Sequence, residues 1–294
     1  SSFMFDPKVL YDPVEDKFIL VILSGNNPTT SSVVVGFSVS ENPMDGWYFY
    51  TFDGDYLQGN WFDYPNIGIS GTDLFITGNL FTDNSGFAQS VVLQIDKNPG
   101  YVGGNVEWDY FNNVENGNGN DAFTIVPASY GYDGDYGPGI FMVSNSSFGG
   151  SSIFLYEVTD SLAGNNVINA FTVNTSNFSP GGDGLQLNSN DLLDTGGNRI
   201  RNAFYANGNV HFVFGVAFQN VYTGVRYNRL DVANLDNDHT NFGISQMDLG
   251  YPTVAPYSLD ETSDEVMIIY LQTGSTIFPQ VRAINVDEGM EFST

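Results

Sequence analysis

One strand pattern returns five times along the chain, at spacings of about 55 to 75 residues. Each copy begins with small or turn-forming residues and ends in a polar turn, and an apolar run precedes it. The copies begin at Ser31, Gln89, Ser151, Thr223 and Phe278. A repeat of this length is typical of propeller blades, because one blade cannot bury both of its faces and must stack on its neighbours. We therefore predict an all-β fold, a five-bladed β-propeller.

The repeat also predicts how the chain is divided. We expect a single domain over residues 1–294, with blades at approximately 1–58, 59–117, 118–187, 188–249 and 250–294. Aromatic and β-branched residues are abundant, and Gly, Asn, Asp and Ser punctuate short segments, as in short strands joined by tight turns. The Gly- and Asn-rich stretch 112–120 is expected to be a loop.

The charge of the chain restricts its partners. It has 34 acidic and 8 basic residues, a formal net charge of −26. Nucleic acid and anionic membranes both attract Lys and Arg, so neither is an expected partner. The chain has no cysteine and therefore no disulfide. It also lacks a run of 18 apolar residues, so we do not expect it to insert into a membrane.

Composition also favours a location. Few Lys, no Cys, and abundant Asn, Gly, Ser and Thr favour an extracellular bacterial protein, secreted or at the cell surface. The chain begins Ser1-Ser2-Phe3, without an initiator Met or a signal-like stretch. We expect it to be a mature or excised fragment of a larger secreted protein with flanking domains.

Three Asp-x-Asp pairs are candidate calcium ligands, because hard carboxylate oxygens suit Ca²⁺. The pairs are Asp53 with Asp55, Asp133 with Asp135, and Asp236 with Asp238. Bound cations would relieve the self-repulsion of so acidic a chain. None of the pairs continues into a full calcium loop, so each also fits an ordinary solvated turn.

Polar residues stand where the first strand of each expected blade begins. In a propeller these strands line the central channel, and their first residues face its mouth, where ligands bind. Asp6 and Asp63 hold this position in the first two blades. Their carboxyl groups could serve in catalysis, bind a cation, or cap strand ends by accepting backbone N–H groups. Arg199 and Arg201 alternate along one segment, so their guanidinium groups suit the carboxylate or sulfate of an acidic sugar, or pair with nearby Asp.

Aromatic side chains are the remaining ligand candidates, because exposed rings bind sugar rings. Most of them alternate along strands and are expected between blades. Trp61, Tyr64 and Tyr132 fall in expected loops or strand starts, as does Tyr251. His211 lies in an apolar strand and is expected to be structural.

Two resemblances follow from the motifs. Phe5-Asp-Pro-Lys-Val-Leu-Tyr-Asp-Pro, Gly46-Trp-Tyr-Phe-Tyr and Asp63-Tyr-Pro-Asn-Ile-Gly resemble the propeller region of a largely uncharacterised family of secreted bacterial proteins. That likeness implies the fold and secretion. The chain also resembles, more weakly, the five-bladed glycoside hydrolases of the arabinanase and xylosidase type.

The second resemblance implies roles for two residues. Asp6 would be the general base and Asp63 the carboxylate that orients it. The third blade would supply a Glu as general acid, but Gly119-Asn-Asp-Ala-Phe-Thr contains none. Asp121 and Asp135 are the acidic residues there, and Glu107 and Glu115 fall before the strand.

We interpret the chain as an extracellular recognition or adhesion module that binds a glycan or another cell-surface ligand and is stabilised by calcium. The alternative is a glycoside hydrolase or lyase that uses Asp6 and Asp63, and a third hypothesis is a purely structural domain. Enzymatic activity stays open, with the missing Glu weighing against it. A groove with paired acids would favour the enzyme, and a shallow aromatic face would favour binding.

Overall fold

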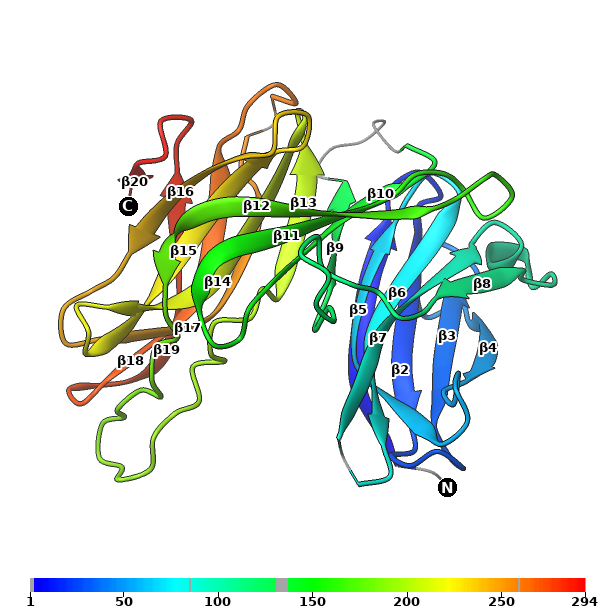
Figure 1. The fold of residues 1–294 in the computed structure, drawn as a ribbon, viewed down its shortest axis with the longest axis horizontal. Helices are drawn as coiled ribbons and strands as arrows, with labels where there is room; N and C mark the ends of the chain where they lie inside the picture. Colours follow the sequence, from blue (N-terminus) through cyan, green and yellow to red (C-terminus); the bar gives the residue numbers. More distant parts are fainter. Residues whose placement is uncertain (1–2, 85, 131–136, 259, 294) are drawn as a thin grey trace. The chain divides into compact units, whose positions relative to one another are not determined.

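A computed structural model of the chain describes residues 3–84, 86–130, 137–258 and 260–293 (Figure 1). Within these residues the chain is strand and connecting loop, apart from one short 3₁₀ helix, η1 (Gly100–Val102). The all-β prediction is confirmed. No helix among the described residues is long and apolar enough to cross a membrane. Tyr132, Asp133 and Asp135, predicted as ligand or metal contacts, lie outside the described residues.

The first eight strands form two antiparallel sheets of four strands, in the orders β1-β2-β3-β4 and β5-β6-β7-β8. Their bounds are β1 (Met4–Asp12), β2 (Lys17–Ser24), β3 (Ser32–Ser38), β4 (Trp47–Asp53), β5 (Asn60–Ile69), β6 (Asp73–Thr82), β7 (Phe87–Asp96) and β8 (Trp108–Phe111). Each sheet is a meander, because strands that follow one another in sequence are also neighbours in the sheet.

The remaining strands form one sheet of eight strands and one of four. The larger sheet has the order β12-β11-β10-β9-β13-β14-β15-β16, and the last has the order β17-β18-β19-β20. Their bounds are β9 (Val126–Tyr130), β10 (Ile140–Asn145), β11 (Gly150–Val158), β12 (Ile168–Phe178), β13 (Asn202–Ala206), β14 (Asn209–Phe218), β15 (Tyr222–Asp231), β16 (Asp236–Phe242), β17 (Asp248–Pro256), β18 (Val266–Gly274), β19 (Ile277–Val286) and β20 (Phe292–Ser293).

The described strands therefore make five successive four-stranded meanders, gathered in four sheets. The third and fourth meanders are joined because their first strands, β9 and β13, pair in parallel. The five repeated strands of the sequence are the third strands, β3, β7, β11, β15 and β19, and the apolar runs before them are the second strands. Second and third strands lie inside each meander, which explains their continuous apolar sequences.

The described chain divides into two compact units. Unit 1 contains β1 to β8, unit 2 contains β13 to β20, and β9, β10, β11 and β12 contribute residues to both. The core of unit 1 includes Val21, Val35 and Leu80, which are fully buried, and the core of unit 2 includes Val213 and Ile268. Each such side chain contributes about 1.5 to 3 kcal/mol on burial.

Three first strands share an irregularity near their start. β1, β5 and β17 each shift register at a bulge, and the bulge contains a residue with positive φ directly before a proline. These residues are Asp6 (φ 49°), Tyr64 (φ 60°) and Tyr251 (φ 48°). A left-handed conformation costs a residue with a side chain roughly 1 to 2 kcal/mol, and a following proline favours extended backbone instead. Strain of this kind gathers at functional sites, so these positions are candidates for one.

Candidate functional site

Asp6 and Asp63 lie on strands β1 and β5 of unit 1, which pack against each other. The Asp6 side chain is exposed, and that of Asp63 is half-buried. The pKa of the Asp63 carboxyl is raised, chiefly by burial and further by the negative charge of Asp6. One interaction acts in the opposite direction: Asp63 Oδ1 accepts a hydrogen bond from the N–H of Tyr64 at 2.8 Å, which lowers the pKa. The two carboxyl groups that the sequence singled out thus interact electrostatically.

An aromatic residue accompanies Asp63 on its strand. Trp61 precedes it by two positions in regular register, so both side chains lie on the same side of β5. The half-buried Trp61 ring packs on Phe81 of β6, with ring centroids 5.5 Å apart and planes at 34°. Tyr64, also half-buried, occupies the bulge that follows. Unit 1 therefore places a carboxyl group beside an aromatic ring.

A buried amide fixes the strand behind Asp63. Asn79 stands opposite Asp63 in the β5 and β6 pairing. Its Oδ1 accepts hydrogen bonds from the Thr124 N–H at 3.0 Å and from Ser90 Oγ at 2.9 Å, and its Nδ2 donates to Thr124 Oγ1 at 3.1 Å. No local sequence pattern indicates this role for Asn79, because most of its partners lie far away along the chain.

A second cluster forms in unit 2 around the predicted ligand residues Arg201 and Tyr251. The guanidinium carbon of Arg201 lies 4.7 Å from the centre of the Tyr251 ring, and Arg201 Nη2 donates to the Gly196 carbonyl at 2.6 Å. The Tyr251 hydroxyl donates to Asp194 Oδ2 at 2.8 Å. The hydrogen bonds from the Gly196 N–H and from Tyr251 hold the pKa of Asp194 below its ordinary value, and the charges of Arg201 and Arg199 lower it further.

Arg199 and Arg201 were expected to point to the same side of one strand, but they do not lie on a strand. Both precede β13 and lie outside any strand, so strand alternation does not orient them. Arg199 Nε instead donates to Ser147 Oγ at 3.4 Å. Both guanidinium charges lower the pKa of Asp194.

The other two arginines of the same region are structural. Arg226 is buried and donates to the backbone carbonyls of Ser176 at 2.9 Å and Asn177 at 3.2 Å. Arg229 forms ion pairs at 3.5 Å with Asp238 and with Asp264. The four arginines therefore fall into two sets: Arg199 and Arg201 lie in the loop before β13, and Arg226 and Arg229 lie on β15.

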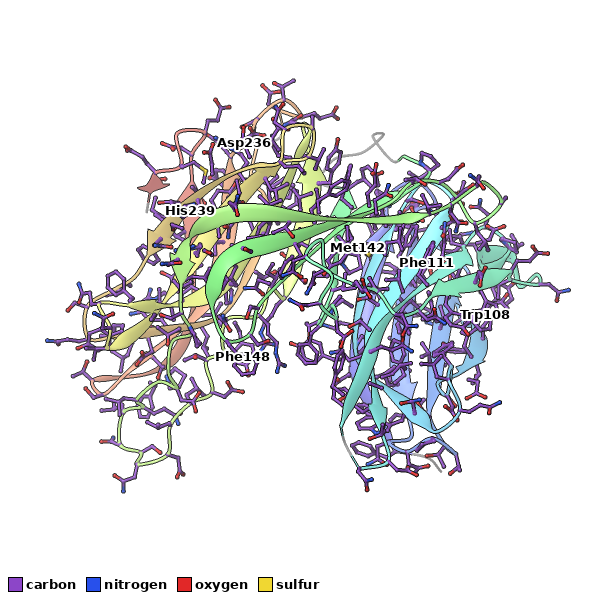
Figure 2. The ribbon with its side chains drawn as sticks, in the orientation of Figure 1. Trp108, Phe111, Met142, Phe148, Asp236 and His239 are labelled. Atoms are coloured by element: carbon purple, nitrogen blue, oxygen red, sulfur yellow. The ribbon has the colours of Figure 1, made fainter. Side chains whose placement is uncertain are left out.

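The described Asp-x-Asp pairs take part in turns and ion pairs. Asp53 accepts the N–H of Asp55 at 2.9 Å, and the Asp55 carboxylate accepts the N–H groups of Gly59 and Asn60, both at 2.9 Å. Asp236 begins β16 (Figure 2). Within the described ranges no group of three or more His, Asp or Glu side chains is placed to hold a metal ion. Calcium binding stays a prediction.

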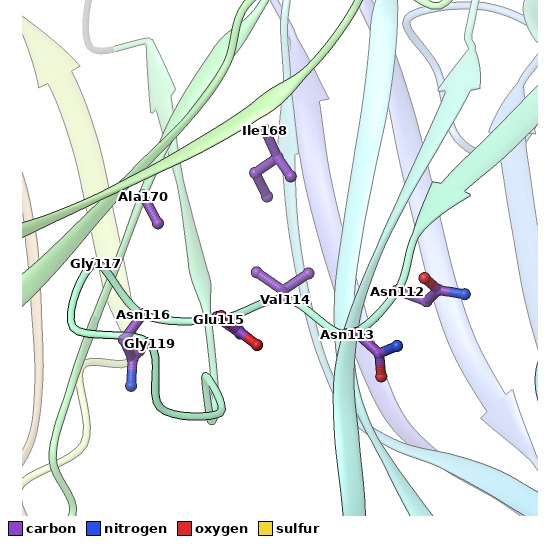
Figure 3. A pocket seen from close by; sticks show the side chains of 9 residues that line it. All are labelled: Asn112, Asn113, Val114, Glu115, Asn116, Gly117, Gly119, Ile168 and Ala170. Atoms are coloured by element: carbon purple, nitrogen blue, oxygen red, sulfur yellow. The ribbon is translucent and has the colours of Figure 1, made fainter.

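Unit 1 also contains a cavity of about 410 Å³ that sequence analysis did not foresee (Figure 3). Its lining combines polar loop residues with two apolar residues of β12. The lining residues are Asn112, Asn113, Val114, Glu115, Asn116, Gly117, Gly119, Ile168 and Ala170. The stretch 112–120 appeared in the sequence only as a loop, and none of the predicted ligand residues lines this cavity.

His211 is structural, as expected. It is fully buried, its Nδ1 lies 2.7 Å from the Tyr227 hydroxyl, and its ring stacks on Phe204 with centroids 4.5 Å apart. Burial lowers the pKa of His211 to about 3, and the charge of Arg229 acts in the same direction. The imidazole is therefore neutral at physiological pH.

No protein-family model and no curated protein matches the sequence. The resemblance to a family of secreted bacterial proteins therefore stays a prediction.

Solved structures align with nearly the whole chain at low identity. The endo-arabinase from Bacteroides thetaiotaomicron VPI-5482 is 14% identical, with 97% of this chain and 95% of that one covered at a TM-score of 0.47. The α-L-arabinofuranosidase from Lactobacillus brevis is 12% identical, with 97% and 92% covered at a TM-score of 0.46. The GH43_1 enzyme from Xanthomonas citri complexed with xylose is 8% identical, with 100% and 91% covered at a TM-score of 0.44. Likeness at TM-scores below 0.5 carries no argument about chemistry.

Proposed function

We propose that this protein is a glycoside hydrolase built on a five-bladed β-propeller, with Asp6 and Asp63 as its acidic pair. The observation that carries the proposal is the interaction between these two carboxyl groups on adjoining first strands. Glycoside hydrolysis needs two carboxyl groups whose environments separate their protonation states, one to give or take a proton and one to stay ionised. Burial raises the pKa of the Asp63 carboxyl, which supports such a role for one of the two groups.

Trp61 supports a sugar as the ligand of this pair. Its ring lies on the same side of β5 as Asp63. Aromatic rings offer the apolar faces of sugar rings a flat contact surface, while carboxylates accept the sugar hydroxyls. The positive φ at Asp6 and Tyr64 adds strained backbone at the same place.

Two exposed apolar faces support the closed propeller. In the first meander, Val9 and Phe49 lie in one cross-strand row and are 63% and 58% exposed. In the last meander, Ile269 and Val281 are 41% and 71% exposed. Apolar faces of this kind are normally covered, and a closed propeller would cover each with a neighbouring blade. A crystal structure with five blades around one axis is the expected result, and a two-sheet sandwich would overturn the fold proposal.

Turnover of glycans tests the activity. We expect the protein to release reducing ends from at least one member of a panel of plant, algal and bacterial polysaccharides. Asp6→Asn and Asp63→Asn should each lower that rate by roughly 10²-fold or more. Asp83→Asn, which neutralises an exposed carboxylate in a turn of the same unit, is the matched control and should leave the rate unchanged.

The same experiment separates hydrolysis from recognition. If no glycan is cleaved but one is retained by the protein, and Trp61→Ala abolishes retention, the protein is a binding module, secreted or at the cell surface. Turnover that survives both Asp6→Asn and Asp63→Asn would overturn the assignment of the acidic pair.

A further inference from the structure

We propose that Ser176 and His239 form a second reactive site, in which Ser176 is a nucleophile towards esters with a short acyl group and His239 is its general base. Both residues belong to unit 2. The site shares no residue with the Asp6 and Asp63 pair, so it goes beyond the proposed glycoside hydrolysis and does not rest on it. Its substrate class is an O-acyl ester, such as an acetylated alcohol.

The two side chains meet where two edge strands approach each other. β12 and β16 are the outermost strands of the eight-stranded sheet, and His239 lies on β16 beside β12 (Figure 2). Ser176 Oγ, on β12, lies 2.6 Å from His239 Nε2. A hydroxyl within about 2.6 to 3.2 Å of an imidazole nitrogen is the arrangement that activates a serine. The Ser176 side chain is exposed, so an ester reaches it from solvent.

The neighbours of the other ring nitrogen place the imidazole proton. His239 Nδ1 lies 3.5 Å from Thr175 Oγ1, which also accepts a hydrogen bond from Asn237 Nδ2 at 3.2 Å. A hydroxyl oxygen has two lone pairs, so Thr175 can accept from an Nδ1–H as well. With the proton on Nδ1, the lone pair of Nε2 faces the Ser176 hydroxyl. This tautomer is the one that a general base needs.

A buried arginine fixes both strands around the pair. Arg226, on β15, donates from Nη1 to the Ser176 carbonyl at 2.9 Å and from Nη2 to the Asn177 carbonyl at 3.2 Å. Its Nε donates to Asn241 Oδ1, on β16, at 2.9 Å. One guanidinium thus joins the serine strand to the histidine strand. Reacting groups that are held in this way lose little freedom on the path to the transition state.

The charges around His239 leave it available as a base. Burial lowers the pKa of His239, and the charge of Arg226 lowers it further. A hydrogen bond to the Asn237 backbone and the charge of Asp238 act in the opposite direction, but the net pKa stays below the ordinary value of 6.5. The imidazole is therefore neutral above that pH and accepts a proton from Ser176.

Acyl transfer then follows in two steps. Ser176 Oγ bonds to the ester carbonyl carbon while its proton passes to His239 Nε2, and the alcohol takes that proton as its C–O bond breaks. Water attacks the acyl-serine in the same way, which releases the carboxylic acid and restores Ser176. Edge strands present alternate backbone N–H groups that no neighbouring strand of the sheet accepts, and those of β12 and β16 are the donors available to the oxyanion.

The surroundings of Ser176 favour a short acyl group. Asn174 and Asn177 are the exposed side chains closest to it along β12, and both are polar. A long acyl chain gains no apolar contact from them, because only apolar surface gives a favourable burial term. An acetyl group needs no such contact.

Two probes applied to the full chain test the nucleophile. A fluorophosphonate, which reacts with activated serines, should form a single adduct that peptide mass spectrometry places on Ser176. p-Nitrophenyl acetate should release nitrophenolate faster than p-nitrophenyl octanoate does. Ser176→Ala should abolish both reactions, and Ser189→Ala, at an exposed loop serine of the same unit, is the matched control that should leave both unchanged. Reactions that survive Ser176→Ala, or a faster release from the octanoate, would overturn the proposal.

Variants of the base separate catalysis from a structural role. His239→Gln should slow adduct formation by roughly 10²-fold or more. In the wild type the rate should rise with pH as His239 loses its proton and level off near or below pH 6.5, and His239→Gln should lose this rise. An unchanged rate in His239→Gln would contradict the assignment of the base.

Thr175 is tested as a positioning residue. Thr175→Val removes the acceptor of the Nδ1–H and should slow adduct formation, whereas Thr175→Ser keeps the hydroxyl and should react as the wild type does. Equal rates in the two variants would contradict the orientation of the ring by Thr175.

Two further measurements keep the result unambiguous. Thermal unfolding of each variant shows whether it folds, and if His239→Gln does not, Ser176→Ala and the two Thr175 variants still test the site. Asp6→Asn and Asp63→Asn should react with the fluorophosphonate as the wild type does. The failure of the proposed hydrolase and the failure of this site are therefore distinguishable.

Discussion

The ammonium group of Lys97 and the carboxylate of Asp12 meet at 2.5 Å with both side chains fully buried. Tyr101 donates its hydroxyl to the same Asp12 oxygen at 2.8 Å, and the other oxygen accepts the N–H of Val14 at 3.1 Å. Breaking a buried pair leaves an uncompensated charge, which costs far more than the loss of a surface ion pair. The pair thus ties the end of β1 to the segment after β7.

Removal of either charge should strongly destabilise unit 1. We expect Lys97→Met and Asp12→Asn each to lower the free energy of unfolding by about 3 to 5 kcal/mol, as measured by urea denaturation. The double variant Asp12→Leu with Lys97→Met should cost less than the sum of the two single changes, because no buried charge remains. Asp83→Asn serves as the exposed control and should change stability by less than about 0.5 kcal/mol. Additive single effects would contradict the pairing.

His211 should make stability depend on pH. Its pKa is about 3 in the folded chain, against an ordinary value of 6.5. Below pH 6.5 the unfolded chain binds a proton that the folded chain refuses, so stability falls as the pH falls from 6.5 towards 3. The slope should approach about 1.4 kcal/mol per pH unit. His211→Gln should remove most of this slope in urea titrations at several pH values. His239→Gln should remove less of the slope, because burial also lowers the pKa of His239 but that side chain is less buried. An unchanged slope in His211→Gln would refute the assignment.

The charge of Asp6 should influence the titration of Asp63. Because the charge of Asp6 raises the pKa of Asp63, Asp6→Asn should lower the pKa of the Asp63 carboxyl. The carboxyl carbon signal of Asp63 in an NMR pH titration measures this without any substrate. Asp83→Asn should leave the signal where it is. No movement of the Asp63 pKa in Asp6→Asn would mean that the carboxyl groups do not interact.

Backbone strain at Asp6 should affect the free energy of unfolding of variants at this position. Asp6→Gly and Asp6→Ala both delete the carboxylate, but only Gly adopts the φ of 49° without a steric penalty. We expect the Gly variant to be more stable than the Ala variant by about 1 kcal/mol. The reverse order, which is the ordinary one within a strand, would mean that the left-handed backbone is absent in solution.

The repeated strands were predictable from sequence, but the starts of the first strands were not. Strands such as β3 and β7 repeat one pattern after an apolar run, and that pattern carries their position. Asp6, Tyr64 and Tyr251 each precede a proline, and sequence rules favour extended backbone there. The positive φ at these residues depends on the packing of neighbouring strands, which no local pattern contains.

The sequence was sufficient to choose candidate site residues but not to predict their contacts in space. The blade repeat singled out Asp6 and Asp63, and the structure lets their charges interact. Arg199 and Arg201 were chosen for a strand geometry that is wrong, since loop contacts with Gly196 and Ser147 hold them. The Lys97 and Asp12 pair joins residues 85 positions apart, and nothing in either local sequence indicates its partner.

The parallel pairing of β9 with β13 bears on the order in which the chain opens. It joins Ala128 to Ala203, Ser129 to Phe204 and Tyr130 to Tyr205, so that two neighbouring meanders share one hydrogen-bonded ladder. Repeats that contact only their neighbours open from the ends inward, and a shared ladder makes two of them lose backbone protection together. Amide hydrogens of β10 and β14, which lie inside the joined sheet, should therefore exchange with solvent last, after those of the terminal meanders.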